Sequence, residues 1–141
     1  MSVNLVPFSI ESYAEAVSLW KQSDGVTLSN ADTEEKIRKY LERNPGMSLI
    51  ARDDSGVIVG AILCGHDGRR GYIHHLTVHP DSRRQGIGRR LVESCLSRLQ
   101  AVGIIKCHIF LVNENERGLE FWKHIGWTFR TDVSIVSRMI G

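Results

Sequence analysis

Apolar and polar residues recur along the chain with two different periods, which together predict a succession of strands and helices. Apolar residues spaced by three and four positions predict helices at 10–21, 33–43, 87–100 and 113–124. Runs rich in β-branched residues predict strands at 4–7, 48–53, 57–64, 72–78 and 106–112, with two more near Thr128 and at 134–138. Three consecutive strands thus lie between two groups of helices, an order that indicates a mixed α/β fold.

The turn between the strand at 72–78 and the helix at 87–100 combines glycines with arginines. Gly86 and Gly88 let the backbone turn tightly and approach a ligand, because no Cβ intrudes. The first N–H groups of the helix have no intrahelical partners, and the helix dipole is positive at that end. Four arginines flank the turn: Arg83, Arg84, Arg89 and Arg90. The turn therefore predicts a binding site for a phosphate or pyrophosphate.

The glycine spacing excludes two common phosphate-binding motifs. The dinucleotide fingerprint G-x-G-x-x-G requires a third glycine three residues after Gly88, where this chain has Leu91. The nucleotide P-loop requires G-x-x-x-x-G-K-[ST], and the sequence contains no such run. A nucleotide-binding regulatory domain is therefore disfavoured.

Composition narrows the class of protein further. The 141 residues suffice for one domain with a buried core, and 42% hydrophobic with 24% charged residues is typical of a globular protein. A net charge of +2 gives no reason to expect a nucleic-acid partner. No apolar run long enough to span a membrane and no signal pattern are present, so we expect a cytoplasmic protein. Cys64, Cys95 and Cys107 lie far apart, which predicts buried thiols and no metal site.

Two motifs give the chain a family resemblance. The run Arg83-Arg-Gln-Gly86-Ile-Gly88, preceded by Leu76-Thr-Val78-His-Pro-Asp, resembles the R/Q-x-x-G-x-G/A signature of the GCN5-related N-acetyltransferase (GNAT) superfamily. The run from Asn115 to Trp127 is similar to the later motif of that family, N-x-x-A-x-x-F-Y-x-x-x-G-F. The resemblance covers nearly the whole chain. It implies one GNAT domain, residues 1–141, with a mostly antiparallel sheet of six or seven strands flanked by four helices.

The resemblance also implies the cosubstrate, acetyl-coenzyme A, and the residues that hold it. In the family the loop amides bind the pyrophosphate, the preceding strand presents backbone groups to the pantetheine arm, and the asparagine of the later motif contacts coenzyme A. Carried over residue by residue, the cofactor-binding set is Leu76, Thr77, Val78, Arg83, Arg84, Gln85, Gly86, Ile87, Gly88, Arg89, Asn115 and Trp122. Trp122 departs from the motif, because relatives have there a tyrosine that protonates the leaving thiolate.

The strand at 72–78 supplies the candidate catalytic groups. The backbone N–H of Leu76 is expected to stabilise the developing oxyanion. Relatives often place a glutamate base at the position of Tyr72, whose phenol cannot act as a base at pH 7, so the base is another residue or a water. Strand alternation places His74 on the same face as Tyr72, Leu76 and Val78, and its imidazole titrates in the right range. His74 is therefore the candidate base, with His75 as the alternative if the strand is bulged.

These assignments predict an N-acetyltransferase that moves the acetyl group directly to a primary amine in a ternary complex. No cysteine lies where an acyl-enzyme nucleophile would be required. The alternative is a non-catalytic acyl-CoA-binding sensor, motivated by the missing tyrosine and glutamate. The acceptor stays open among small molecules, amino acids and protein amines. A homodimer is a possible assembly, since sheet-edge dimers occur among the relatives.

Overall fold

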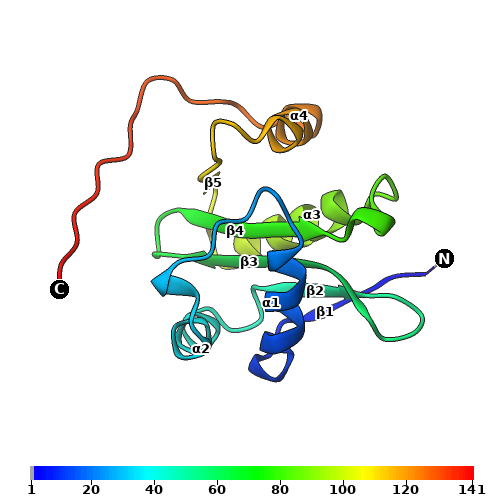
Figure 1. Ribbon diagram of the computed structural model, residues 1–141. Coiled ribbons are helices and arrows are strands. Elements are labelled where there is room, and N and C mark those ends of the chain that lie inside the picture. Colours follow the sequence, from blue (N-terminus) through cyan, green and yellow to red (C-terminus); the bar gives the residue numbers. More distant parts are fainter. Residues whose placement is uncertain (1) are drawn as a thin grey trace.

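The computed structural model describes residues 2–141 and consists of a central sheet with helices on both of its faces (Figure 1). The strands are β1 (Asn4–Pro7), β2 (Leu49–Arg52), β3 (Ile58–His66), β4 (Gly71–Val78) and β5 (Cys107–Ile109). The helices are α1 (Tyr13–Lys21), α2 (Glu34–Arg43), α3 (Ile87–Ala101) and α4 (Glu116–His124). Three short 3-10 turns lie at Ile10–Ser12, Asn30–Asp32 and Pro80–Ser82. The predicted order of elements is confirmed as far as α4.

The sheet follows the order of the chain, β1-β2-β3-β4-β5. The first four strands pair antiparallel; short turns join β2 to β3 and β3 to β4, whereas α1 and α2 lie between β1 and β2. β5 pairs with β4 in parallel, because the chain crosses over through α3 before it returns to the sheet. The N-terminal end of α3 therefore lies next to the end of β4, where the glycine-rich turn joins them.

Two hydrophobic clusters, one on each face, hold the sheet between its helices. One cluster, which includes Trp20, Ile50 and Leu63, lies between the sheet and helices α1 and α2. The other, which includes Leu91 and Cys95, lies between the opposite face of the sheet and α3 (Figure 1). β3 is apolar almost throughout because both of its faces are buried.

α3 fits tightly against the sheet at Gly60. A Cβ at that position would lie 3.2 Å from Leu91 Cδ1 and 3.3 Å from Ile87 Cγ2, so the glycine allows close contact between helix and sheet. In residues 2–141 no helix, α3 included, has the length and apolar character needed to cross a bilayer.

The prediction of two C-terminal strands was wrong, and the sheet has five strands where six or seven were expected. Residues 127–141 form neither helix nor strand, and residues 128–141 are exposed throughout. After Gly126 the chain runs clear of the sheet (Figure 1). β5 is likewise shorter than the predicted 106–112. A strand exists only where a neighbour supplies the ladder of hydrogen bonds, and an apolar run in the sequence does not reveal whether that neighbour is present.

Truncating Leu91 should destabilise the fold strongly. The side chain is fully buried between α3 and β3, so Leu91→Ala leaves a cavity. We expect the free energy of unfolding to fall by about 2–5 kcal/mol, measured by urea denaturation. Val57→Ala is the control, because Val57 is exposed in the β2–β3 turn; its effect should stay within about 0.5 kcal/mol. Equal losses in both variants would contradict the packing described above.

Candidate functional site

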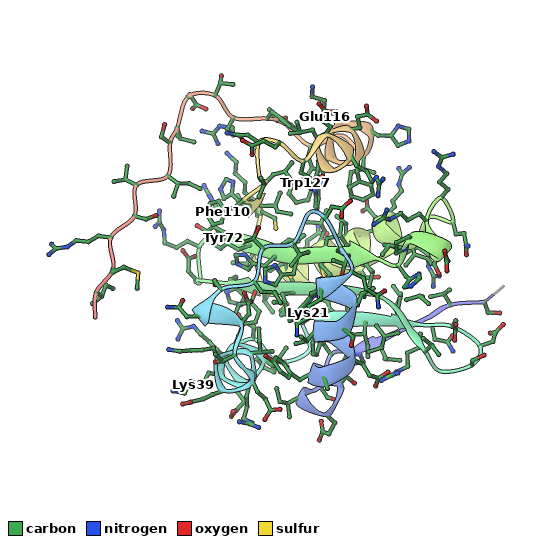
Figure 2. The ribbon with its side chains drawn as sticks, in the orientation of Figure 1. Lys21, Lys39, Tyr72, Phe110, Glu116 and Trp127 are labelled. Atoms are coloured by element: carbon green, nitrogen blue, oxygen red, sulfur yellow. The ribbon has the colours of Figure 1, made fainter. Side chains whose placement is uncertain are left out.

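β4 and β5 separate after only three residue pairs. The parallel ladder joins Gly71–Ile73 to Cys107–Ile109 and goes no further. From His74 to Val78, β4 therefore has no β5 partner among the described residues, and its backbone on that side is open. Tyr72 and Phe110 lie next to each other at this edge, with ring centroids 6.1 Å apart (Figure 2). The opening gives an extended ligand access to strand backbone.

A β-bulge interrupts β4 within this open stretch. Leu63 pairs with His74 and Ala61 with Thr77, so one residue of β3 faces two residues of β4, His75 and Leu76. His75 has φ +50°, in the left-handed region that residues other than glycine rarely adopt. The bulge is the condition under which the sequence suggested His75 as an alternative to His74.

The bulge overturns the simple alternation predicted for this strand. His74 lies near Tyr40 of α2, with ring centroids 6.1 Å apart, and His75 lies 5.0 Å from Trp20 of α1. Both histidines therefore face α1 and α2, whereas Leu76 and Val78 pack against the cluster under α3. Because the extra residue shifts the phase of side-chain directions by one position, Leu76 and Val78 do not share a face with His74.

A close polar contact with Asp32 holds His75 in its unusual conformation. Nε2 of His75 lies 2.7 Å from Oδ1 of Asp32, and both side chains are largely buried. Asp32 is fixed in turn, since its Oδ2 accepts from the backbone N–H of Ser29 at 2.9 Å and its carbonyl accepts from the Tyr13 hydroxyl at 2.6 Å. A left-handed non-glycine residue costs about 1–3 kcal/mol, and this buried contact offsets the strain.

His74 lies half-buried between α2 and the β5 edge. Its ring centroid is 6.2 Å from that of Phe110 and 6.1 Å from that of Tyr40. Burial lowers the pKa of His74, and the neighbouring His75 lowers it further, while Asp32 acts in the opposite direction. The imidazole is therefore neutral at pH 7 and able to accept a proton.

The glycine-rich turn has the features of an anion site. Gly86 is the residue before the first turn of α3, with φ +78° and open space where a Cβ would stand. No side chain caps the helix, and its first turn contains no acidic residue. Arg83 donates from Nε to the carbonyl of Val78 at 3.1 Å and so anchors the turn to β4. Arg84, Gln85 and Arg89 are exposed around it.

Two residues of the turn, Ile87 and Gly88, take part in the packing of the core. Ile87 is buried in the core under α3. A Cβ at Gly88 would lie 3.3 Å from the ring of Phe121, so the glycine allows α4 to approach the start of α3. Ile87 and Gly88 can therefore contact a ligand only through their backbone N–H groups. Arg90, expected at the rim, points elsewhere and donates to the carbonyl of Val3 at 3.2 Å.

Asn115 caps α4 and touches a distant loop. Its Oδ1 accepts from the backbone N–H of Gly118 at 3.0 Å. A Cβ at Gly25 or at Gly118 would approach Nδ2 of Asn115 to 2.5 Å, so both glycines lie directly against the amide. Gly25 belongs to the loop between α1 and α2, which passes over β4 towards α4 (Figure 1). This loop thus spans the opening between β4 and β5.

Trp122 is part of the core. It is only 3% exposed, and its ring packs against Trp127 and Phe121 at centroid distances of 4.5 and 5.2 Å. The indole N–H keeps its proton at neutral pH. This environment supports a packing role for Trp122 and gives no support to proton donation.

Comparison with known proteins identifies the family. The Acetyltransferase (GNAT) family matches residues 13–127, most of the chain. The protein belongs to this family. An acetyltransferase of Sodalis glossinidius is 28% identical over 133 residues, which cover 94% of this chain and 92% of the relative. An acetyltransferase of Yersinia enterocolitica is 29% identical, covering 94% and 93%. The predicted enzyme class, an acetyltransferase, is confirmed.

Solved structures confirm the GNAT fold. The PaiA N-acetyltransferase of Thermoplasma acidophilum in complex with coenzyme A superposes with a TM-score of 0.80 at 19% identity, covering 92% of each chain. Ard1 of Thermoplasma volcanium gives a TM-score of 0.76 at 18% identity, over 92% of this chain and 85% of the other. An aminoglycoside 6'-N-acetyltransferase of Acinetobacter baumannii gives 0.78 at 14% identity, over 99% and 100%.

Sequence reasoning missed two contacts of this GNAT site. The pairing of Asp32 with His75 joins residues 43 positions apart; its only local signal was Ser29 three residues before Asp32, the spacing of a capping box. The contact of Gly25 with Asn115 has no signal in either segment. A surface hollow of about 670 Å³ between β1 and α3 lies at the opposite edge of the sheet from these groups.

The lowered pKa of His74 predicts a pH-dependent stability. In the unfolded chain this histidine takes up a proton near pH 6.5, whereas the folded protein resists protonation. The contribution of His74 to the free energy of unfolding is therefore fully present above about pH 6.5 and is lost as the pH drops towards the lowered pKa. Urea denaturation at pH 7.5 and 5.5 should show a smaller loss for His74→Asn than for the wild type. His124→Asn, at the exposed end of α4, is the control; an identical loss in all three proteins would contradict the assignment.

Proposed function

We propose that the protein transfers the acetyl group of acetyl-CoA directly to a primary amine, with both substrates bound at once. The observation that supports this most is the open backbone of β4 between His74 and Val78, which leads directly into an uncapped helix N-terminus. The first can hold an amide-containing arm and the second a pyrophosphate. Acetyl-CoA carries both groups in that order.

The pyrophosphate is assigned to the turn before α3. The N–H groups of the first helical turn point towards it, and the dipole of this 15-residue helix favours negative charge there. Arginine side chains next to the turn add positive charge that neutralises the phosphates. The residues proposed to contact the pyrophosphate, through side chains or through backbone N–H groups, are Arg83, Arg84, Gln85, Gly86, Ile87, Gly88 and Arg89. Asn115 is placed at the other side of the opening, as a contact for the pantetheine arm.

The thioester is assigned to the bulge in β4. A bulge leaves a backbone group unpaired in the ladder, and here that region includes the N–H of Leu76. This N–H is proposed to donate to the thioester oxygen as it becomes negative, while the backbone of Thr77 and Val78 continues towards the pantetheine arm. Preorganised backbone donors need no rearrangement during the reaction.

His74 is the proposed base, and its neutral state supports this role. It removes a proton from the ammonium, whose nitrogen then attacks the thioester carbon. The carbon–nitrogen bond forms, the carbon–sulfur bond breaks, and coenzyme A leaves as a thiolate. The new amide nitrogen releases its remaining extra proton as the adduct collapses. Trp122 is buried and holds its own proton, so a water is proposed to pass the released proton to the thiolate. His75, fixed by Asp32, is the alternative base and otherwise holds the bulge in place.

The acceptor is assigned only as a primary amine. The α1–α2 loop and the face that carries His74 border the place where the amine would approach. The carboxylate of Asp32 lies near this place but is already engaged with His75. The aminoglycoside 6'-N-acetyltransferase named above is only 14% identical to this chain, so its acceptor does not narrow the choice.

The decisive test combines binding with turnover. Calorimetric titration with acetyl-CoA should show binding, and thiol release should follow when a panel of small amines and peptides is added. Binding without thiol release across a broad panel would favour the sensor alternative. Absence of binding would overturn the assignment of the turn at 83–89.

Gly86→Asp should strongly weaken binding of coenzyme A while the protein stays folded. A carboxylate placed at the helix N-terminus repels the pyrophosphate, and we expect affinity to fall by roughly tenfold or more in calorimetry. Gly56→Asp is a matched control, because Gly56 has φ +81° and equally open surroundings in the β2–β3 turn. It imposes the same backbone strain without a charge at the site. Unchanged affinity in Gly86→Asp would refute the pyrophosphate assignment.

His74→Ala should lower the rate of acetyl transfer by about 10²–10⁴ at pH 7, because a positioned base contributes that much. The defect should shrink at high pH, where the amine has already lost its proton. kcat/KM is measured from pH 5.5 to 9.5 for the wild type, His74→Ala and His75→Ala. A normal profile in His74→Ala, with the loss of rate near pH 7 appearing in His75→Ala instead, would move the role to His75.

A further inference from the structure

His75 lies in the bulge of β4 and carries a backbone conformation that favours glycine. Its φ is +50°, and the peptide group that follows it contains the N–H of Leu76. Because a peptide group is planar and rigid, the direction of this N–H is set by the φ and ψ of His75. A return of His75 to the extended region would rotate the peptide group and turn the N–H away. The conformation of His75 therefore controls the direction of the proposed oxyanion donor.

Histidine, unlike glycine, needs support to stay in this conformation. The side chain of His75 supplies that support through two contacts that differ in kind. Its ring packs edge-on against Trp20 of α1, with a centroid distance of 5.0 Å and an angle of 60° between the planes. Its Nε2 lies 2.7 Å from Oδ1 of Asp32. The packing contact limits where the ring can lie, whereas the polar contact also fixes its direction, because hydrogen bonds depend on angle.

Asp32 is held in place by groups outside the sheet. Its Oδ2 accepts a hydrogen bond from the backbone N–H of Ser29 at 2.9 Å, and its carbonyl oxygen accepts one from the Tyr13 hydroxyl at 2.6 Å. The Asp32 side chain is only 10% exposed, and both of its carboxylate oxygens have partners. A carboxylate bound in this way is a fixed anchor for the histidine, and it is poorly suited to bind the ammonium of an acceptor directly.

We propose that Asp32 is a positioning residue for acetyl transfer, which acts through His75 to hold the N–H of Leu76 towards the thioester oxygen. In this role Asp32 touches neither the acetyl group nor the amine. The inference rests on the proposed function, in which this N–H stabilises the oxyanion. A donor that is already in place needs no rearrangement as the oxygen becomes negative, and Asp32 provides that preorganisation from the turn before α2.

Asp32→Ala should lower kcat by roughly tenfold to a hundredfold, because loss of an oxyanion donor costs about 10²–10³ and here the donor is only misdirected. KM for acetyl-CoA should change little, since the turn at 83–89 still binds the pyrophosphate. The defect should be equal at every pH from 7 to 9.5, because the oxyanion needs its donor whether or not the amine has already lost its proton. A defect that shrinks as the pH rises would assign Asp32 to proton removal and overturn the proposal.

Asp54→Ala is the matched control for this measurement. It removes the same charge from an exposed position in the β2–β3 turn and should leave kcat and KM unchanged.

A double-mutant cycle with His75→Gly tests the route through His75. Glycine adopts positive φ without support, so Asp32 has nothing to hold in that background. Adding Asp32→Ala to His75→Gly should therefore cause no further loss of kcat, and the double variant should be faster than Asp32→Ala alone. A loss that persists in the glycine background would contradict the proposal, because Asp32 would then act on something other than the conformation of residue 75.

NMR of the free protein measures that conformation without any turnover, from the backbone carbon shifts and the coupling between the amide and α protons of residue 75. The left-handed signature should be present in the wild type and the double variant and lost in Asp32→Ala, with cooperative urea unfolding in all three. Its retention in Asp32→Ala would refute the positioning role. A wild type that releases no thiol with any amine refutes the proposed function and this role together, whereas equal kcat in the wild type and Asp32→Ala refutes this role alone.

Discussion

The early separation of β4 from β5 is the constraint on which the proposed site depends. Parallel pairing stops at Ile73, so five residues of β4 keep an open backbone directly before the turn into α3. A closed ladder would use the same groups to stabilise the sheet and would leave none for a ligand. The sheet thus gives up local pairing where a chain of amide groups can be bound, and it places that stretch beside a helix N-terminus.

The bulge in β4 adds a second constraint, which ties the α1–α2 region to the strand. His75 adopts a left-handed conformation, and Asp32 from the turn before α2 holds it there. Moving either element therefore strains the other. The contact of Gly25 with Asn115 links the same region to α4 across the opening. The elements around the proposed acceptor side are coupled through these two contacts, although they lie far apart in the sequence.

The sequence was sufficient where structure is set by local patterns. The helical spacing that ends in Cys95 and Leu99 predicted α3 within a residue of its observed bounds, and Gly86 and Gly88 marked its start correctly. Local patterns failed where a distant partner decides. The bulge changes which face Leu76 occupies, and it depends on the register with β3. The contact of Arg90 with Val3 depends on β1 lying beside α3, which no pattern around Arg90 reveals.

The same reasoning explains why the C-terminal strands were predicted and are absent from the structure. The alternation around Ile135 is a true strand pattern, but it states only that the segment suits a sheet, not which sheet. Soluble proteins usually protect a free edge with charges, proline or a covering element. β5 is flanked by Ile105 and Phe110, and only Lys106 adds charge at its start. A pattern of this kind becomes a strand only where an edge is presented to it, and neither the open edge of β5 nor its position relative to residues 134–138 can be read from the local sequence.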